Sequence, residues 1–126
     1  MDDLRIERIL RAVECVPHGR AATYGMIGRI TGEVPRVVGW VMHAWGADQC
    51  WWRMVNARGT IPGHAERALP HWAQEGMLSS EDAQAHQRGV LSVRDSGIEL
   101  SRVLVDEEQL RTLWTARIRD LPSVGE

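Results

Sequence analysis

Two helix signals only a few residues apart, at 23–32 and 35–45, constrain this chain most strongly. Thr23 is a residue type that caps helix N-termini, and the apolar residues after it have helical spacing as far as Gly32. Pro35 then occupies a position that the first turn of a new helix tolerates. Two short helices joined by a tight turn that contains glycine are typical of a helix-turn-helix.

The second of these helices has two contrasting faces. Its inward stripe is predicted to be Val38, Val41, Met42 and Trp45. The opposite stripe is Arg36, Gly39, Trp40 and His43. A cation, a gap for close approach, an aromatic ring and a histidine suit a helix that faces DNA. They equally suit a solvated face with one tryptophan, so the stripe alone leaves both interpretations open.

Helices are also predicted near both ends of the chain. Residues 3–16 carry apolar side chains at the i, i+3, i+4 and i+7 spacing of an amphipathic helix. Another helix is expected after the short apolar stretch 103–105. Its inward residues are predicted to be Leu110, Leu113 and Trp114.

The segment between these helices predicts turns and one short strand. Residues 20–22 are expected to form a turn that leads into the helix-turn-helix. Residues 46–62 are expected to contain a loop, a short strand at 54–55 and a turn at 56–59.

Residues 63–86 give no clear pattern, and they contain Pro70, which disfavours a helix interior. Ser79 or Ser80 can cap a short helix over 81–88. The rest of this segment stays without a prediction.

The patterns together favour a mainly α fold with a small β wing. The 126 residues predict one domain over 1–120 and a frayed tail at 121–126. Cys15 and Cys50 form no CxxC pair and no zinc-site spacing, so neither a metal nor a cofactor is expected. The sequence shows no signal peptide and no membrane-spanning run, which favours a cytoplasmic protein without a membrane partner.

The charge is weakly negative overall but unevenly distributed. A net charge of −2 provides no global basic field that would attract nucleic acid. Residues 18–58, however, contain five arginines against two acidic residues, whereas residues 95–126 contain four arginines against seven acidic residues. Positive charge therefore gathers where the helix-turn-helix is predicted, unless the difference is an ordinary fluctuation in a neutral protein.

Three motifs in this region follow one another in a recognisable order. They are Val16-Pro17-His18-Gly19-Arg20-Ala21-Ala22-Thr23-Tyr24-Gly25, Pro35-Arg36-Val37-Val38-Gly39 and Cys50-Trp51-Trp52-Arg53-Met54-Val55-Asn56-Ala57-Arg58-Gly59. In their order and spacing the chain resembles the O6-alkylguanine-DNA alkyltransferase family over residues 5–62. A looser fourth match, Gln87-Arg88 and Gly97-Ile98, is similar to the family's Gln-Arg…Glu-Gly-Val pattern.

The resemblance implies a winged helix-turn-helix that enters the minor groove of DNA and flips O6-alkylguanine out of the base stack. It implies that Arg36 fills the gap left by the base, that Tyr24 helps to rotate the 3′ phosphate, and that Gly39 permits close approach. Taken singly, each could instead be an ordinary surface or packing residue. The residues expected to bind DNA are Thr23, Tyr24, Arg36, Gly39, Trp40 and His43.

The third motif departs from the family at the residues that carry its chemistry. When the motif is aligned on Arg53 and the residues after it, the family's alkyl-accepting cysteine falls on Trp51 and its activating histidine on Trp52. The loose fourth match places the orienting glutamate on Ser96. Because an indole cannot replace a thiolate nucleophile, the resemblance implies an alkyltransferase-like protein that is not an enzyme.

The lesion pocket is expected to contain Trp51, Arg53, Val55, Asn56 and His64. His64 occupies the position where some relatives carry an arginine that contacts the lesion base, which implies a weaker contact here. The two adjacent tryptophans could instead be core residues of a rebuilt pocket, and this alternative is stronger for Trp52.

Three functions follow from these observations. The first is a monomeric, non-enzymatic protein that binds O6-alkylguanine in double-stranded DNA and flags it for nucleotide excision repair proteins. The second is a DNA-binding or interaction module with a degenerate pocket. The third is alkyl transfer to Cys50, which a register shifted by one residue aligns with the family's cysteine. Neither register gives that thiol a neighbouring base.

Overall fold

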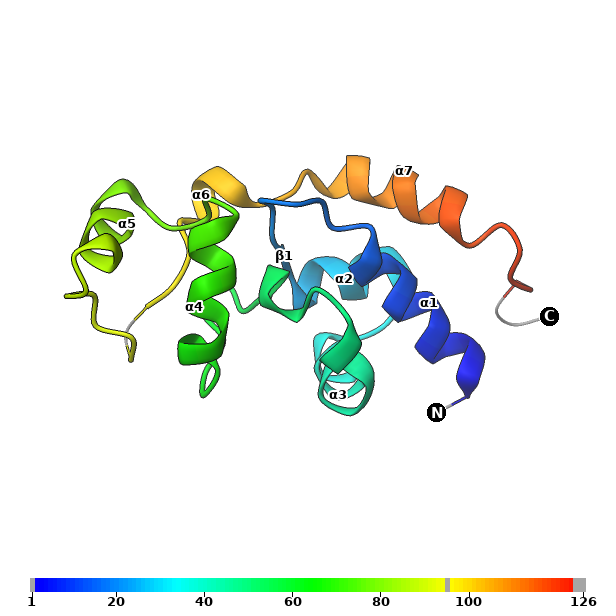
Figure 1. Cartoon of the computed structure of the whole chain (residues 1–126). Coiled ribbons are helices and arrows are strands. Elements are labelled where there is room, and N and C mark those ends of the chain that lie inside the picture. Colours follow the sequence, from blue (N-terminus) through cyan, green and yellow to red (C-terminus); the bar gives the residue numbers. More distant parts are fainter. Residues whose placement is uncertain (1, 95, 124–126) are drawn as a thin grey trace.

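The computed structural model describes residues 2–94 and 96–123. Helices α1 (Asp3–Glu14), α2 (Tyr24–Thr31) and α3 (Pro35–Trp45) pack against one another, and α7 (Glu107–Arg117) lies against α1 and α2 (Figure 1). Helices α2 and α3 are joined by a three-residue turn, so the predicted helix-turn-helix is confirmed.

The ends of these two helices follow the local signals in the sequence. The Thr23 hydroxyl accepts a hydrogen bond from the backbone N–H of Met26 at 3.1 Å, which caps α2 as predicted. Gly32 ends α2 in the left-handed conformation at φ 80°, where glycine pays no steric cost. Pro35 is the first residue of α3 and lacks only an N–H that the helix would leave unpaired there.

A small parallel sheet ties the helix-turn-helix to the middle of the chain. Strand β1 (Ala22–Thr23) pairs with β2 (Met54–Val55), with Ala22 opposite Met54. The strand at 54–55 is confirmed, whereas the prediction of a turn at 20–22 is wrong for Ala21, which forms a bridge with Leu104, and for Ala22. A two-residue strand is too short to show alternation in sequence, so only its partner reveals it.

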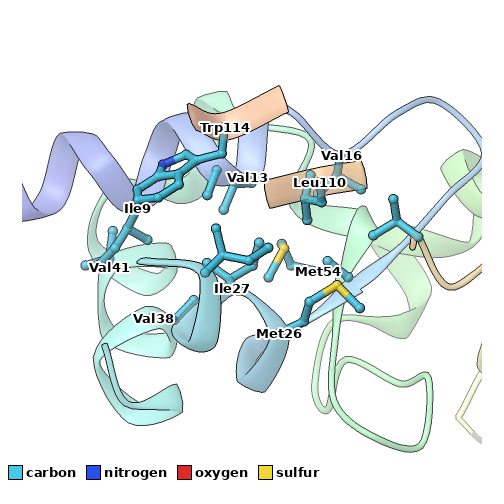
Figure 2. Packing of buried hydrophobic residues seen from close by; sticks show 14 of the residues in the cluster. Ile9, Val13, Val16, Met26, Ile27, Val38, Val41, Met54, Leu110 and Trp114 are labelled. Carbon is cyan, nitrogen blue, oxygen red and sulfur yellow. The ribbon is translucent and has the colours of Figure 1, made fainter. Parts of the chain in front are cut away.

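The first of two hydrophobic clusters lies between the four helices (Figure 2). Ile27 of α2 is completely buried, with Val38 and Val41 of α3 on one side and Leu110 and Trp114 of α7 on another. The predicted inward residues of α1, α2 and α7 therefore meet in one core, with the exception of Leu113. This packing sets the orientation of α3 relative to the other three helices.

The second hydrophobic cluster draws many of its residues from the segment 63–86, which carries no clear sequence pattern. Helices α4 (Ala65–Gln74), α5 (Ser80–Gln87) and α6 (Leu100–Val103) contribute to it, together with the 3₁₀ turn η2 (Trp51–Arg53); a second 3₁₀ turn, η1 (Gly46–Asp48), follows α3. In Figure 1, α4 and α5 lie toward the opposite end of the molecule from α1. The predicted helix at 81–88 is confirmed as α5, with the Ser79 hydroxyl accepting from the N–H of Asp82.

Helix α4 was not predicted because Pro70 lies inside it. Proline removes a helical hydrogen bond, but here tertiary packing outweighs that cost. Trp72, two residues later, is completely buried and donates its indole N–H to the carbonyl of Trp52 at 2.7 Å.

Two predicted inward residues are exposed. Trp45 is 45% exposed because α3 ends at this residue, where η1 leads the chain away. Leu113 is 46% exposed because it lies about 100° around the helix from Trp114, outside the narrow face that α7 buries. The mainly helical fold with a small sheet is otherwise as predicted, and none of the described helices is long and apolar enough to cross a membrane.

Candidate nucleic-acid interface

A cavity of about 480 Å³ opens between α3 and the start of α4. It falls within the range of about 300–1,000 Å³ found for small-molecule sites. Its lining residues are Tyr24, Gly39, Met42, His43, Gly46, Ala47, Trp51, Ile61, Pro62, His64 and Arg67. None of these residues carries a carboxylate or a thiol, so the wall combines apolar surface with neutral and cationic donors.

The cavity brings together five residues that the sequence singled out. These are Tyr24, Gly39, His43, Trp51 and His64. Trp51 faces the cavity, and its ring meets that of His64 edge to face with centroids 6.3 Å apart. Burial raises the pKa of Tyr24, so its hydroxyl remains a hydrogen-bond donor at neutral pH.

The outer surface of α3 carries the other expected DNA-binding residues. Arg36 and Trp40 are exposed and lie outside the cavity wall. An added Cβ at Gly39 would have no other atom within 4 Å, which rules out the alternative that Gly39 serves a helix–helix contact. Thr23 is half-buried and its hydroxyl caps α2, so its observed role is structural.

The concentration of arginines near the helix-turn-helix is partly neutralised by ion pairs. Arg29 pairs with Glu107 at 2.7 Å and Arg53 pairs with Glu75 at 2.9 Å. Within the described residues, the other three arginines of this region, Arg20, Arg36 and Arg58, form no ion pair. Arg36 therefore provides an available cation on the exposed face of α3.

Three residues expected in the pocket support it from behind. Val55 is completely buried in the second cluster. The Asn56 side chain accepts from the N–H groups of Arg58 and Thr60 and donates to the Thr60 hydroxyl, which stabilises the turn before the cavity. Arg53, like these two, is absent from the cavity wall, so these three residues lie beside the residues that line the cavity.

Arg53 and Trp52 share one buried carboxylate. The Glu75 side chain is 5% exposed. Its carboxylate accepts hydrogen bonds from Arg53 Nε and Nη2, both at 2.9 Å, and from Trp52 Nε1 at 2.7 Å. It also accepts from the N–H of Gly19 at 2.8 Å. Desolvation raises the pKa of Glu75, but the hydrogen bonds from Arg53, Gly19 and Trp52 outweigh it and lower that pKa to about 2.

Trp52 is only partly buried, and its ring stacks on His71 with centroids 3.8 Å apart. It packs against the second hydrophobic cluster and is absent from the cavity wall, which agrees with a packing role. Cys50 is half-buried and also lies outside the wall. The structure therefore does not bring this thiol into the cavity.

Sequence reasoning missed Arg67, whose guanidinium donates to Nδ1 of His64 at the cavity wall. An arginine cannot accept, so this contact requires the neutral imidazole with Nδ1 unprotonated. The signal was the three-residue spacing from His64, which places both side chains on neighbouring positions of a helix. That signal was unusable because α4 itself was not predicted.

Comparison with known proteins assigns the family. The family model for the "6-O-methylguanine DNA methyltransferase, DNA binding domain" matches residues 5–83. The crystal structure of S. pombe Atl1 in complex with damaged DNA containing O6-carboxymethylguanine is similar, with a TM-score of 0.54 and 28% sequence identity. The similarity covers 64% of this chain and 86% of that chain. No curated protein sequence matches the chain.

The extent of the family match corrects the loose fourth motif. Residues 86–100 lie beyond the matched region, and Ser96 Oγ donates to the carbonyl of Ser92 rather than to any pocket residue. Glu75-Gly76-Met77 lies inside the region and fits the Glu-Gly-Val pattern better. The match covers more than half of the chain. The chain therefore belongs to the family defined by the DNA-binding domain of 6-O-methylguanine DNA methyltransferase.

Proposed function

We propose that this protein binds O6-alkylguanine in double-stranded DNA, holds the flipped base in the cavity, and does not transfer the alkyl group. The observation that carries the proposal is the position of Trp51, an indole, in the wall of a cavity beside the helix-turn-helix. The similar Atl1 structure, which contains damaged DNA, supports the same class of ligand. The alternative of a DNA-binding module with a degenerate pocket predicts no preference for the lesion.

The chemistry of the cavity suits an alkylated purine. Trp51, Met42 and Ile61 offer apolar and aromatic surface for the base and its alkyl group. Arg67 can donate to the acceptor atoms of a guanine edge. Arg67 can thereby supply a cationic contact that the neutral imidazole of His64 does not.

The outer face of α3 has the features that base flipping requires. Arg36 is exposed and unpaired among the described residues, and its flat guanidinium can replace a stacked base. Gly39 leaves open space for the groove. We assign Arg36 to the gap left by the base and Tyr24 to the neighbouring phosphate.

The proposal implies that another activity removes the lesion. In the register set by Arg53, the acceptor position is Trp51, and the cavity wall offers no thiol in its place. A bound lesion would remain in the DNA, where nucleotide excision repair proteins could recognise the complex. An incision assay with purified excision proteins tests this hand-over. If adding the protein leaves the incision rate unchanged, the hand-over to excision repair is rejected.

The first experiment compares equilibrium binding of a duplex with one O6-methylguanine and the same duplex with guanine. Salt must be fixed near its physiological concentration because phosphate contacts are strongly salt-dependent. A preference of about tenfold or more, worth about 1.4 kcal/mol, supports lesion recognition. Equal affinity for the two duplexes supports the degenerate-pocket alternative and rejects the proposal.

Two arginine variants sharpen this experiment. Arg36→Ala should weaken binding to the lesion duplex about tenfold or more, since it removes both a charge and the group that fills the gap. Arg88→Ala is the matched control because Arg88 is an exposed arginine that follows α5, far from α3. Equal losses in the two variants would show a general charge effect and count against base flipping.

The remaining enzymatic alternative is tested separately. Mass spectrometry of Cys50 after incubation with methylated DNA should find the unmodified thiol, because Cys50 lies outside the cavity wall. An alkylated Cys50 would replace the binding proposal with a transfer reaction.

A further inference from the structure

Two tryptophans on α3 have no part in the cavity or in the core. Trp40 and Trp45 are 47% and 45% exposed, and their rings meet edge to face with centroids 5.1 Å apart. The other four tryptophans of the chain are buried or partly buried. Adjacent exposed aromatic rings on a soluble protein mark a surface that another molecule covers.

The tryptophan pair lies on the opposite flank of α3 from the cavity. Taking Arg36 as the reference, Gly39 lies about 60° to one side around the helix and Trp40 about 40° to the other. Gly39 lines the cavity and Trp40 does not. Arg36 therefore lies between the cavity flank and Trp40, whereas Trp45, about 180° around the helix from Arg36, joins the Trp40 flank through its ring contact.

A helix that lies in a groove of duplex DNA has one strand on each side. If the damaged base leaves its strand toward the cavity flank, the other flank of α3 faces the undamaged strand. The tryptophan pair is continuous with the exposed stripe of Arg36, Gly39 and His43. This continuity favours DNA over a protein as the molecule that covers the pair.

We propose that Trp40 and Trp45 form a second DNA contact, which packs on the sugars and bases of the undamaged strand. This inference rests on the proposed function, because it requires α3 to lie in the groove. Indole rings suit such a contact because they offer a flat apolar surface to deoxyribose and an N–H that can donate to an acceptor atom at a base edge. The pair would hold the partner strand in place while the target base occupies the cavity.

The test compares the lesion in duplex DNA, the lesion in the same single strand, and the plain duplex. Trp45→Ala and Trp40→Ala should each weaken binding to the duplexes about tenfold while leaving the affinity for the damaged single strand unchanged. Trp45→Phe should retain most of the duplex affinity because it keeps an aromatic face. Leu113→Ala on α7 is the control, since Leu113 is equally exposed at 46% and lies on another helix.

Each outcome decides between the two proposals. Equal losses on single and double strands would overturn the assignment to the undamaged strand, and unchanged duplex affinity would overturn the contact itself. If the wild-type protein shows no preference for the lesion but Trp45→Ala still weakens binding to duplex DNA, the lesion-binding proposal fails and the second contact stands.

A second measurement uses the wild-type chain, so it does not depend on a variant that folds. Photo-crosslinking from 5-iodouracil placed in the undamaged strand near the lesion should modify the peptide that contains Trp40 and Trp45. Crosslinks confined to other peptides would overturn the inference.

Discussion

A methyl group added at Gly39 should raise the stability of the protein and weaken its binding to DNA. Gly39 lies inside α3, an 11-residue helix, and an added Cβ meets no other atom within 4 Å. Glycine in a helix interior costs about 1 kcal/mol relative to alanine. Because nothing opposes the methyl group, Gly39→Ala should increase the free energy of unfolding by about that amount.

The corresponding rise in the melting temperature follows from the size of the chain. For 126 residues, an unfolding entropy of about 2.1 cal/mol/K per residue gives roughly 0.26 kcal/mol/K in total. The gain therefore corresponds to a rise in Tm of about 4 °C. The same methyl group lies on the surface proposed to enter the groove, where a steric conflict of about 1 kcal/mol or more would weaken lesion-duplex binding about fivefold or more.

Thermal unfolding and equilibrium binding should be measured on the same preparation. Gly28→Ala is the matched control within the helix-turn-helix, because an added Cβ there would collide with the backbone carbonyl of Glu33 and should lower Tm. If Gly39→Ala lowers Tm as well, a neighbouring contact has been overlooked. If it raises Tm and the DNA affinity is unchanged, α3 does not approach DNA at Gly39 and the reasoning is refuted.

Three further outcomes concern the residues behind the cavity. Glu75→Gln should lower the free energy of unfolding by about 2 to 3 kcal/mol, measured by denaturant unfolding at pH 7, because it leaves the buried Arg53 charge without its partner. Since the folded pKa of Glu75 lies near 2, below the ordinary value of 4.5, its ionisation stabilises the fold above about pH 4.5. That contribution should disappear as the pH falls toward 2, and an unfolding series in which the wild type and Glu75→Gln show the same acid dependence would contradict it. Gly59→Ala should cost about 1 to 3 kcal/mol, because Gly59 has φ 77° and an added Cβ would lie 2.9 Å from the carbonyl of Ile98; an unchanged Tm would show that the turn relaxes.

Local signals predicted the part of the fold that presents the interface. The threonine cap, the left-handed glycine and the proline at the start of α3 each act within a few residues, so the sequence places them directly. The same holds for the Ser79 cap of α5. These local signals do not show which residues far apart in the sequence pack against one another. For this reason Trp45 was expected to be buried but lies at the surface.

The candidate site was predicted in part for the same reason. Its two sides, Gly39 and His43 on α3 and Trp51 after η1, were recognised from motif order. Arg67 lies on α4 and Glu75 directly follows it, and both were missed because Pro70 hides this helix from sequence patterns. In addition, Glu75 contacts Arg53 across 22 residues of chain. Only tertiary packing shows that Arg53 belongs behind the cavity and Arg67 at its wall.

The hydrogen bond between Trp52 and Glu75 bears on how few substitutions would separate this chain from a protein that accepts an alkyl group itself. In the register aligned on Arg53, Trp52 falls on the family's activating histidine, and the ring N–H of Trp52 donates to the Glu75 carboxylate at 2.7 Å. A histidine ring at that position would find its orienting acid already in place, secured by Arg53 and the N–H of Gly19. In that register, substitutions at two adjacent positions, 51 and 52, would therefore give the proposed lesion-binding protein the family's cysteine and histidine. The scaffold that would orient the restored histidine is already built.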